Sequence, residues 1–300
     1  MADDTNAPAA DSAVEPGLRL VRAPNPSPMT HTGTNTWIVG TGAVAVIDPG
    51  PDEPRHLAAI LAALGPGERV AAIFVTHAHR DHAALARALA ARTGAQIHAA
   101  GNLAGRRRPM MARLAADGLV GGGEGIDAAF EPDIVLEDGE TVRGSGWEIG
   151  AVATPGHTSD HLAYTWSGAV FTGDLVMGWA SSLVSPPDGD LVAFFASCRR
   201  LAALPARVFY PGHGDPVTDP AGRLAWLLAH REGRAGAVIE ALKTGPATPA
   251  ALTRAIYADV DVRLLPAAER NVLAHLIALV EDGRAHPVGP LSAGAEFALT

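Results

Sequence analysis

Three histidines and one aspartate lie within a single short run of the chain, from Thr76 to His82. Neutral imidazole nitrogens and carboxylate oxygens are ligands that zinc, iron and manganese share, so a metal ion is a natural partner. His77 and His79 are two residues apart and would project to the same side of an extended loop, whereas Asp81 and His82 point elsewhere. The spacing predicts one metal on each pair; the alternative is a solvated polar loop with Asp81 as a helix cap.

Three later residues strengthen the metal interpretation. His157, Asp174 and His213 each follow an apolar run that reads as a strand, and glycine or proline comes shortly before the polar residue. Taken singly, each would be interpreted as a turn residue that bonds to backbone. Together with the first run, they provide two sets of ligands and one carboxylate that could bridge two metals.

The segments around the first run indicate which elements hold it. The apolar residues 70–75 are typical of a buried strand, and residues 83–93 of a helix that Gly94 ends. The run therefore lies in a strand-to-helix loop, where rigid elements hold the side chains in place. Residues 36–39 and 43–47 are expected to pair as a hairpin.

This ordered set of residues resembles the signature of the metallo-β-lactamase-fold hydrolases, which is H-x-H-x-D-H followed by His, Asp and His. The resemblance implies an α/β fold, a four-layer αββα sandwich. It also implies two metals: the first held by His77, His79 and His157, the second by Asp81, His82 and His213, with Asp174 bridging. Asp48, in the segment Ile47-Asp48-Pro49-Gly50, would orient a ligand rather than bind metal.

The expected chemistry follows from two metals about 3.5–4 Å apart. They would lower the pKa of a shared water, and the metal-bound hydroxide would attack a carbonyl carbon or a phosphorus. Two Zn²⁺ ions are expected, with iron or manganese as alternatives because the set contains no thiolate. Asp81 could also accept a proton from the nucleophile. His161 lies close to His157 in sequence, so it could donate a proton to a leaving group or brace the ligand loop.

Three consecutive arginines precede the second ligand set. Arg106, Arg107 and Arg108 could bind a phosphate or an acidic substrate. The alternative is that they form the solvated face of a helix.

The last part of the chain has a different pattern. Helices are expected over residues 221–243 and 266–280, and another helix is expected to begin after a cap at Thr248. A short strand is expected at 284–288. Together these elements resemble a winged-helix unit. Basic and acidic residues balance between Arg231 and Arg284. DNA binding needs a basic footprint, so DNA is not expected as a partner, and the unit is expected to wall one side of the active cleft.

The tail narrows the resemblance to the lactamase-beta-2-like group. The segments His230-Arg231-Glu232-x-Arg234 and Asn271-Val272-x-x-His275-Leu276 are similar to that group, whose best-studied type is an endoribonuclease acting on single-stranded RNA. The expected function is therefore a dinuclear hydrolase with single-stranded RNA as one candidate substrate. A glyoxalase II-like thioesterase or a lactonase, acting on a small-molecule ester or thioester, is the alternative. A winged-helix nucleic-acid-binding regulator with a vestigial metal site is an alternative of another class.

Composition sets the remaining expectations. The chain has 300 residues, 48% of them hydrophobic, and a net charge of −9. Residues 1–16 are expected to be a disordered tail, 17–219 the hydrolase domain and 220–300 the C-terminal domain. The single cysteine, Cys198, excludes an internal disulfide framework, and no segment resembles a secretory signal or a membrane span, which predicts a cytoplasmic protein without a membrane partner.

Overall fold

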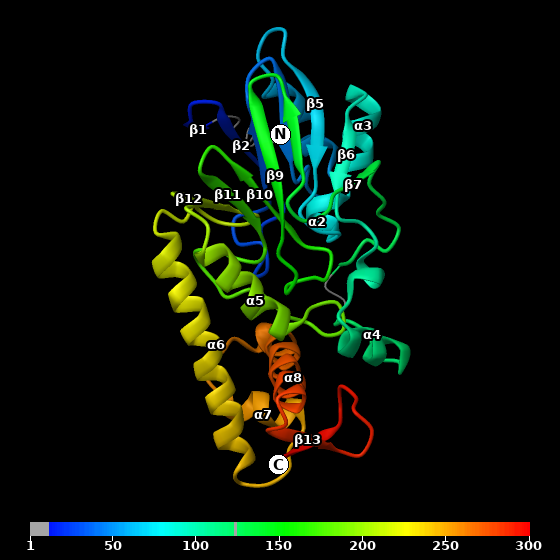
Figure 1. Cartoon of the computed structure of the whole chain (residues 1–300), viewed down its shortest axis with the longest axis vertical. Helices are drawn as coiled ribbons and strands as arrows, with labels where there is room; N and C mark the ends of the chain where they lie inside the picture. Colours follow the sequence, from blue (N-terminus) through cyan, green and yellow to red (C-terminus); the bar gives the residue numbers. More distant parts are fainter. Residues whose placement is uncertain (1–11, 123–124) are drawn as a thin grey trace, which may run out of the picture.

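Two β-sheets form the centre of the computed structural model, which describes residues 12–122 and 125–300 (Figure 1). The first sheet follows the chain order and contains β1 (Ser12–Glu15), β2 (Leu18–Arg22), β3 (Asn35–Val39), β4 (Ala43–Ile47), β5 (Arg69–Phe74), β6 (Gln96–Ala99) and β7 (Ile134–Val135). The second has the order β12-β11-β10-β9-β8 and contains β8 (Thr141–Gly144), β9 (Trp147–Ala153), β10 (Leu162–Trp166), β11 (Ala169–Gly173) and β12 (Val208–Pro211).

Alternate side chains along a strand face different layers of the fold. On β4, Ala45 and Ile47 face the core between the two sheets, whereas Val44 and Val46 face the outer helices. Because both faces of this strand are covered, its sequence is a continuous apolar run rather than an alternating one. Trp37 and Phe171, from opposite sheets, meet in the intersheet core with ring centroids 5.9 Å apart.

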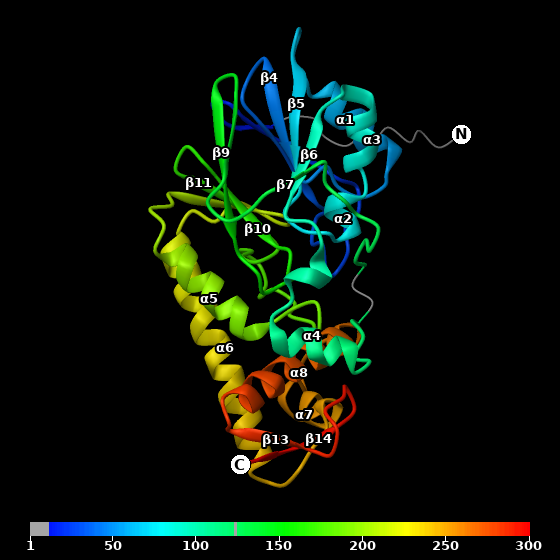
Figure 2. The same cartoon turned by 45° about the vertical axis from the view of Figure 1, so that its right-hand side comes forward.

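Helices cover the outer face of each sheet, as Figure 2 shows for the first one. The first sheet is covered by α1 (Pro54–Ala62) and α3 (Ala86–Thr93), and the second by α5 (Leu191–Ala202). Gly94 ends α3 with a φ of 74°, a conformation that glycine adopts without strain. The predicted αββα sandwich is confirmed.

The expectation of a disordered tail over residues 1–16 is wrong for its last part. β1 pairs antiparallel with β2, Val14 packs against the intersheet core, and Glu15 forms an ion pair with Arg207. These contacts bury apolar surface and satisfy the backbone, which offsets the entropy of ordering the segment. Residues 1–11 lie outside the described part of the chain.

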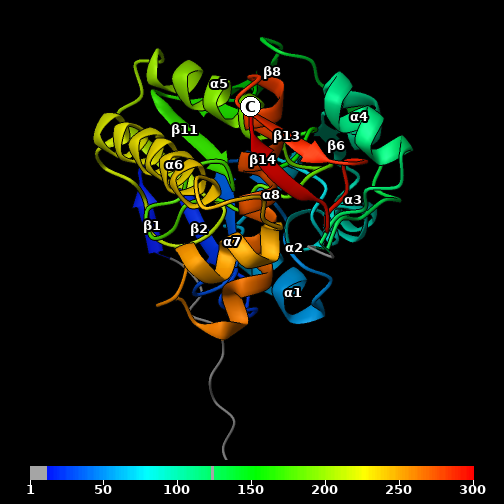
Figure 3. The same cartoon turned by 90° about the horizontal axis from the view of Figure 1, so that it is seen from below.

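Three helices and a two-stranded ribbon form the C-terminal unit, seen from below in Figure 3. They are α6 (Pro220–Leu242), α7 (Pro249–Ile256), α8 (Leu265–Glu281) and the antiparallel pair β13 (Ala285–Val288) and β14 (Glu296–Leu299); a short 3₁₀ turn, Val262–Leu264, precedes α8. Thr248 caps α7 by accepting a hydrogen bond from Ala251 N, as predicted. The winged-helix prediction is confirmed.

Helix α6 contributes to both parts of the molecule. Leu224 and Leu227 pack into the core between α5 and the second sheet, whereas Val238 and Leu242 pack into the C-terminal core. Helix α4 (Pro109–Ala116), from the irregular region after β6, also packs into the C-terminal core. The predicted limits 17–219 and 220–300 therefore stay a proposal about folding units.

Two smaller expectations concern the same helices. Cys198 is buried in α5, where burial raises the pKa of its thiol to about 12, so it is an inert core residue. Among the described residues, no helix is both long and apolar enough to cross a membrane.

Candidate metal centre

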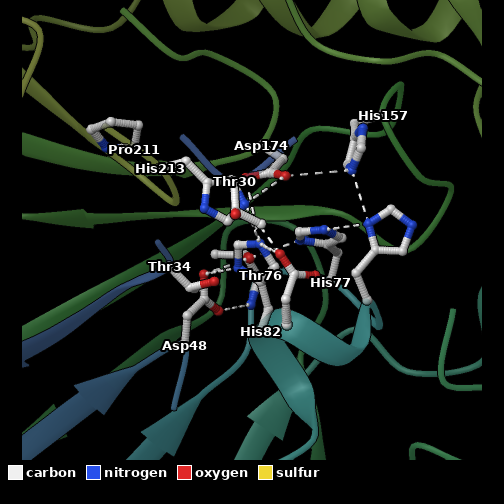
Figure 4. A network of polar contacts seen from close by, with 12 residues as sticks. Thr30, Thr34, Asp48, Thr76, His77, His82, His157, Asp174, Pro211 and His213 are labelled. Carbon is white, nitrogen blue, oxygen red and sulfur yellow. Dashed lines mark hydrogen bonds and ion pairs between the residues drawn. The ribbon is translucent and has the colours of Figure 1, made fainter. Parts of the chain in front are cut away.

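The ends of four strands converge on one cluster of histidines and aspartates (Figure 4). Strands β9, β11 and β12 run in the same direction within the second sheet, so the residues that follow them meet at one edge. The loop after β5 brings its ligands to this edge from the first sheet. The cluster contains all seven predicted ligands: His77, His79, Asp81, His82, His157, Asp174 and His213.

Three histidine nitrogens of the first group face one point. His79 Nδ1 lies 2.9 Å from His77 Nε2 and 3.0 Å from His157 Nε2. All three residues are buried. Three imidazole nitrogens that face one point cannot all be satisfied by hydrogen bonds to one another. This is the arrangement of a metal site with three protein ligands.

The second group contains carboxylates as well as imidazoles. His213 Nε2 lies 3.2 Å from Asp81 Oδ2, 3.3 Å from His82 Nε2 and 3.3 Å from Asp174 Oδ2. Asp174 Oδ2 is also 3.8 Å from His157 Nε2, which belongs to the first group. Asp174 therefore lies between the two groups, where the resemblance places a bridging ligand.

Asp48 and Thr76 form hydrogen bonds with the Nδ1 atoms of two of the histidines, His82 and His77. Asp48 Oδ2 accepts hydrogen bonds from His82 Nδ1 at 2.9 Å and from Thr76 Oγ1 at 2.8 Å. Because the Thr76 hydroxyl proton is donated to Asp48, its oxygen accepts from His77 Nδ1 at 3.0 Å. Asp48 thus fixes the orientation of His82 directly and that of His77 through Thr76, with both Nε2 atoms on the side of the cluster.

Backbone carbonyls hold two further histidines. His157 Nδ1 donates to the carbonyl oxygen of Leu183 at 2.7 Å, and His213 Nδ1 donates to that of Gly33 at 3.3 Å. Leu183 lies in a segment that Arg231 and Asn271 of the C-terminal unit contact: Arg231 donates to Ser182 O, and Asn271 Oδ1 accepts from Val184 N. The C-terminal unit therefore supports the segment that orients His157.

The two groups differ in their electrostatics. Burial lowers the pKa of His77 well below its usual range and that of His79 to about 3, and neighbouring imidazoles add to this effect. Burial would also lower the pKa of His213, but the Asp174 and Asp81 carboxylates outweigh it and raise this pKa to about 9. The first group offers neutral lone pairs, and the second attracts positive charge.

The donor set fits metal ions. Asp174 Oδ1 is buried and has no hydrogen-bond partner among the described residues, which is costly unless another ligand is present. Imidazole and carboxylate donors without thiolate suit zinc, iron and manganese alike. The structure therefore supports a metal-binding cluster.

Gly212, directly before His213, lets the backbone approach the cluster closely. A Cβ atom at this position would lie 2.6 Å from Asp174 Oδ1 and 2.6 Å from His82 Cε1. Both are parts of the cluster rather than the ends of mobile chains, so a side chain would displace them. Gly212 is therefore required for the ligands to meet.

A cavity of about 440 Å³ opens above the cluster. Its floor contains Asp81, Asp174 and His213, and part of its opposite wall is Arg263, Pro266 and Arg270 from the C-terminal unit. The unit thus walls one side of the cleft, as the sequence predicted.

His161 does not lie where a proton donor to the leaving group would have to lie. The residue is buried, its Nδ1 lies 2.9 Å from Thr154 Oγ1, and its ring lies 5.2 Å from that of His77. Burial holds its pKa well below the usual range, so the ring is neutral. His161 does not line the cavity above the cluster. The bracing alternative fits this position, and the predicted role in proton donation does not.

The three arginines also lie away from the cleft. Arg106 pairs with Glu137 at 2.7 Å, Arg107 with Asp188 at 2.7 Å, and Arg108 with both Asp190 and Glu281. None of them lines the cavity above the cluster. Their charges hold the chain segments together, so the geometry does not support the predicted role in substrate binding.

Several residues of the site were not predicted from the sequence. Thr76 precedes the H-x-H motif directly after a strand, and its hydroxyl could have been recognised as a partner for a ligand. Leu183 and Gly33 act through backbone carbonyls, for which the residue type gives no signal. Met29 and Trp179 line cavities at the site but lie in irregular segments without a pattern.

Two families of known domains match the chain. The metallo-beta-lactamase superfamily matches residues 29–213, and the beta-lactamase associated winged helix domain matches residues 248–289. The first match covers more than half of the chain, so the chain belongs to the metallo-β-lactamase superfamily and is a hydrolase. The regulator alternative is therefore not retained.

Individual relatives agree with this assignment. The chain is 28% identical over 266 residues to "Beta-lactamase-like protein 2 homolog" of Caenorhabditis elegans, covering 86% of this chain and 82% of the relative. It is 29% identical to an "Atrochrysone carboxyl ACP thioesterase" of Aspergillus fumigatus, covering 87% and 81%. A metallo-beta-lactamase family protein of Thermus thermophilus superposes with a TM-score of 0.75 at 26% identity, covering 96% of this chain and all of that one.

Proposed function

We propose that this chain is a dinuclear metal-dependent hydrolase that cleaves thioesters. The observation that carries the proposal is the cluster of seven converging donors, five of which line a cavity with an apolar side. One ion would be held by the first histidine group, a second by Asp81, His82 and His213, and Asp174 would bridge them. We take two zinc ions as the first candidate, although the donor set suits iron and manganese equally. Iron is a further candidate because a structural neighbour of 30% identity was solved in a di-iron-bound form.

The chain itself contributes orientation and proton handling. A bound pair of ions would supply the Lewis acidity that activates water and balances negative charge in the transition state. Asp81 is the ligand with a partly exposed carboxylate, 27% for its side chain, and it faces the cavity. Burial raises its pKa, but His82 and His213 outweigh burial and lower it to about 2, so it is ionised at neutral pH. Its oxygens can therefore accept a hydrogen bond from the attacking water and position it.

Hydrolysis of a thioester balances with these groups. The water oxygen forms a bond to the acyl carbon, the C–S bond breaks, and the thiol leaves with one proton of the water. The thiolate is a good leaving group, so a protein acid next to the sulfur is not required. This agrees with the position of His161, which is buried and does not line the cavity above the cluster.

Two observations support a thioester as substrate. Several relatives are named thioesterases, among them the Aspergillus fumigatus protein and "Thioesterase pkgB" of Emericella nidulans. The part of the cleft next to His157 is lined mainly by apolar side chains, which suits an acyl group.

Single-stranded RNA is the second candidate. Arg263 and Arg270 line the cavity above the cluster, and guanidinium groups bind phosphate well. Arg263 pairs with Asp261, and Arg270 donates to Ser185 and to the carbonyl oxygens of Val120 and Pro186, so a phosphate would have to share or replace these partners. The net charge of −9 gives no long-range attraction to RNA, so any such binding would depend on these local groups.

Metal analysis and a substrate panel test the proposal. Purified protein should contain about two metal equivalents per chain, and His213→Ala should reduce this number whereas His286→Ala, at an exposed ribbon position, should not. The panel should contain S-acetyl-N-acetylcysteamine, S-lactoylglutathione, an acyl-homoserine lactone and single-stranded RNA, with His77→Ala as the inactive control. Thioester turnover that His77→Ala abolishes supports the proposal. Metal-loaded protein that cleaves only RNA or only the lactone would overturn the thioester assignment.

A further inference from the structure

A second cavity, of about 210 Å³, extends from the metal centre toward the C-terminal unit. It shares His157, Asp174 and Leu183 with the cavity above the cluster, so the two form one branched space. We name this branch the side arm. Its remaining lining comes from the segment 28–29, the loop 177–181, helices α6 and α8, and residues 257–264.

The wall of the side arm is mostly apolar, although Ser181, His230, Arg231 and Asn271 also line it. Met29, Met177, Trp179, Val260 and Leu264 line it. Among the described lining residues, Asp174 supplies the only carboxylate, and it lies at the end next to the metal centre. Arg231 is engaged with Asn271 and with the carbonyl oxygen of Ser182, and burial lowers its pKa to about 10. A ligand in this arm would therefore meet mostly apolar surface.

Two of the lining residues are large apolar side chains that are exposed to solvent. Met29 is 46% exposed and Trp179 37%, and they come from segments far apart in the sequence. Both flank the same opening, whereas exposed apolar residues on a protein surface are commonly scattered. Their convergence beside a catalytic centre indicates a surface that an apolar ligand group covers.

The wall is held in place before any ligand arrives. The Trp179 ring packs against the His31 ring at an interplanar angle of 30°, with centroids 4.8 Å apart. It also packs so closely on Gly214 that a Cβ there would lie 2.6 Å from Trp179 Cδ1. Arg223 donates to the carbonyl oxygens of Met177 and Ala180, each at 2.6 Å, and so fixes the loop that carries Trp179. A preformed pocket loses little entropy on binding.

From these features we infer that the side arm binds the acyl group of the substrate, and that this group is an apolar chain or ring larger than acetyl. The inference rests on the proposed thioester hydrolysis. With the acyl carbonyl at the cluster, the apolar part of the acyl group extends past Leu183 into the arm. The sulfur and its polar carrier leave through the other branch, past Arg263. A sugar–phosphate chain would gain little from the apolar wall.

Acyl-length selectivity tests the inference. Two substrates differ only in the acyl group, S-acetyl- and S-octanoyl-N-acetylcysteamine, and the wild-type kcat/KM should be at least tenfold higher for the octanoyl compound. Leu264→Trp, at a half-buried position, should fill the arm, and Trp179→Ala should remove part of its wall. Each should lower the octanoyl-to-acetyl ratio at least tenfold. The matched control Val288→Trp, at an exposed ribbon position, should keep the wild-type ratio.

The outcomes separate the inference from the proposed function. Equal kcat/KM values for both thioesters, or equal ratios in all variants, would overturn the acyl-binding arm and leave thioester hydrolysis standing. If the metal-loaded protein hydrolyses neither compound, the proposed function fails and calorimetry decides the inference. S-octyl-N-acetylcysteamine, a thioether without a scissile bond, should then bind metal-free wild-type protein and bind at least tenfold more weakly to Leu264→Trp. An affinity equal for both proteins, or absent from both, overturns the inference.

Discussion

Arg108 Nη2 lies 2.9 Å from Glu281 Oε1, and this ion pair joins the start of α4 to the last residue of α8. The same guanidinium also contacts Asp190, the N-cap of α5, at 2.8 Å. One arginine therefore ties together three helices from different parts of the chain. Its partners are structural carboxylates, so the position of its charge is explained without a substrate.

Arg108→Ala should lower the free energy of unfolding by about 1–2 kcal/mol, because two partly buried charge pairs are lost. The KM for a thioester substrate should stay the same, since Arg108 does not line the cavity above the cluster. Denaturant unfolding and steady-state kinetics measure the two effects. Arg113→Ala is the matched control, because that arginine is on α4, the helix that Arg108 precedes as N-cap, and its side chain is 79% exposed. A large increase in KM at unchanged stability would restore a role in substrate binding.

Asp48→Asn should weaken metal binding about 10- to 100-fold, because the amide cannot accept hydrogen bonds at both of the carboxylate's oxygens. In the wild type, these oxygens receive Thr76 N, Thr76 Oγ1 and His82 Nδ1. Competition with a chromophoric chelator gives the affinities. Asp52→Asn, at an exposed position of the same loop, should bind metal as the wild type does. Equal affinities for both variants would mean that Asp48 only supports the backbone.

Arg231→Met should affect both the fold and the metal centre. The change leaves the Ser182 carbonyl oxygen without its guanidinium donor, and we expect a loss of about 1–3 kcal/mol in the free energy of unfolding. Because Leu183 O holds His157, metal affinity should also fall about tenfold. Arg234→Met is the control, since Arg234 is on the same helix and lies over Tyr257 at 4.4 Å. Loss of stability with wild-type metal affinity would limit Arg231 to a structural role.

His275 should make the protein sensitive to mild acid. Burial, with nearby Arg231 adding to it, lowers its pKa to about 3, whereas the unfolded chain has the usual value of 6.5. The unfolded state therefore binds the proton first, and stability that is present above pH 6.5 is lost as the pH falls toward 3. Between pH 7 and 5 this one residue should cost about 2 kcal/mol.

His275→Leu should remove that part of the acid sensitivity. The difference in unfolding free energy between pH 7 and 5, measured with urea, should be smaller for this variant than for the wild type. His286→Leu, an exposed histidine on β13, should behave like the wild type. An unchanged pH dependence in His275→Leu would show that His275 is not a source of acid sensitivity.

The residues of the His/Asp cluster and the layers of the fold could be predicted from the sequence because the information is local. The seven residues lie shortly after the ends of strands, Asp174 directly after β11, and the side-chain type determines their chemistry. The ion-pair partners of Arg106 and Arg108 could not be predicted from local sequence. Glu137 lies 31 residues from Arg106, and Glu281 lies 173 residues from Arg108, so only the tertiary structure reveals the pairs. The carbonyl oxygen of Leu183 is invisible for another reason, because every residue type has one.

Gly212 has a consequence for how the protein tolerates change. Since even a methyl group at this position would overlap Asp174 and His82, none of the other standard side chains fits without moving the ligands. In a library with every amino acid at position 212, only glycine should survive selection for activity. The position therefore offers an internal standard for the stringency of any directed-evolution experiment on this enzyme, independent of which substrate is selected.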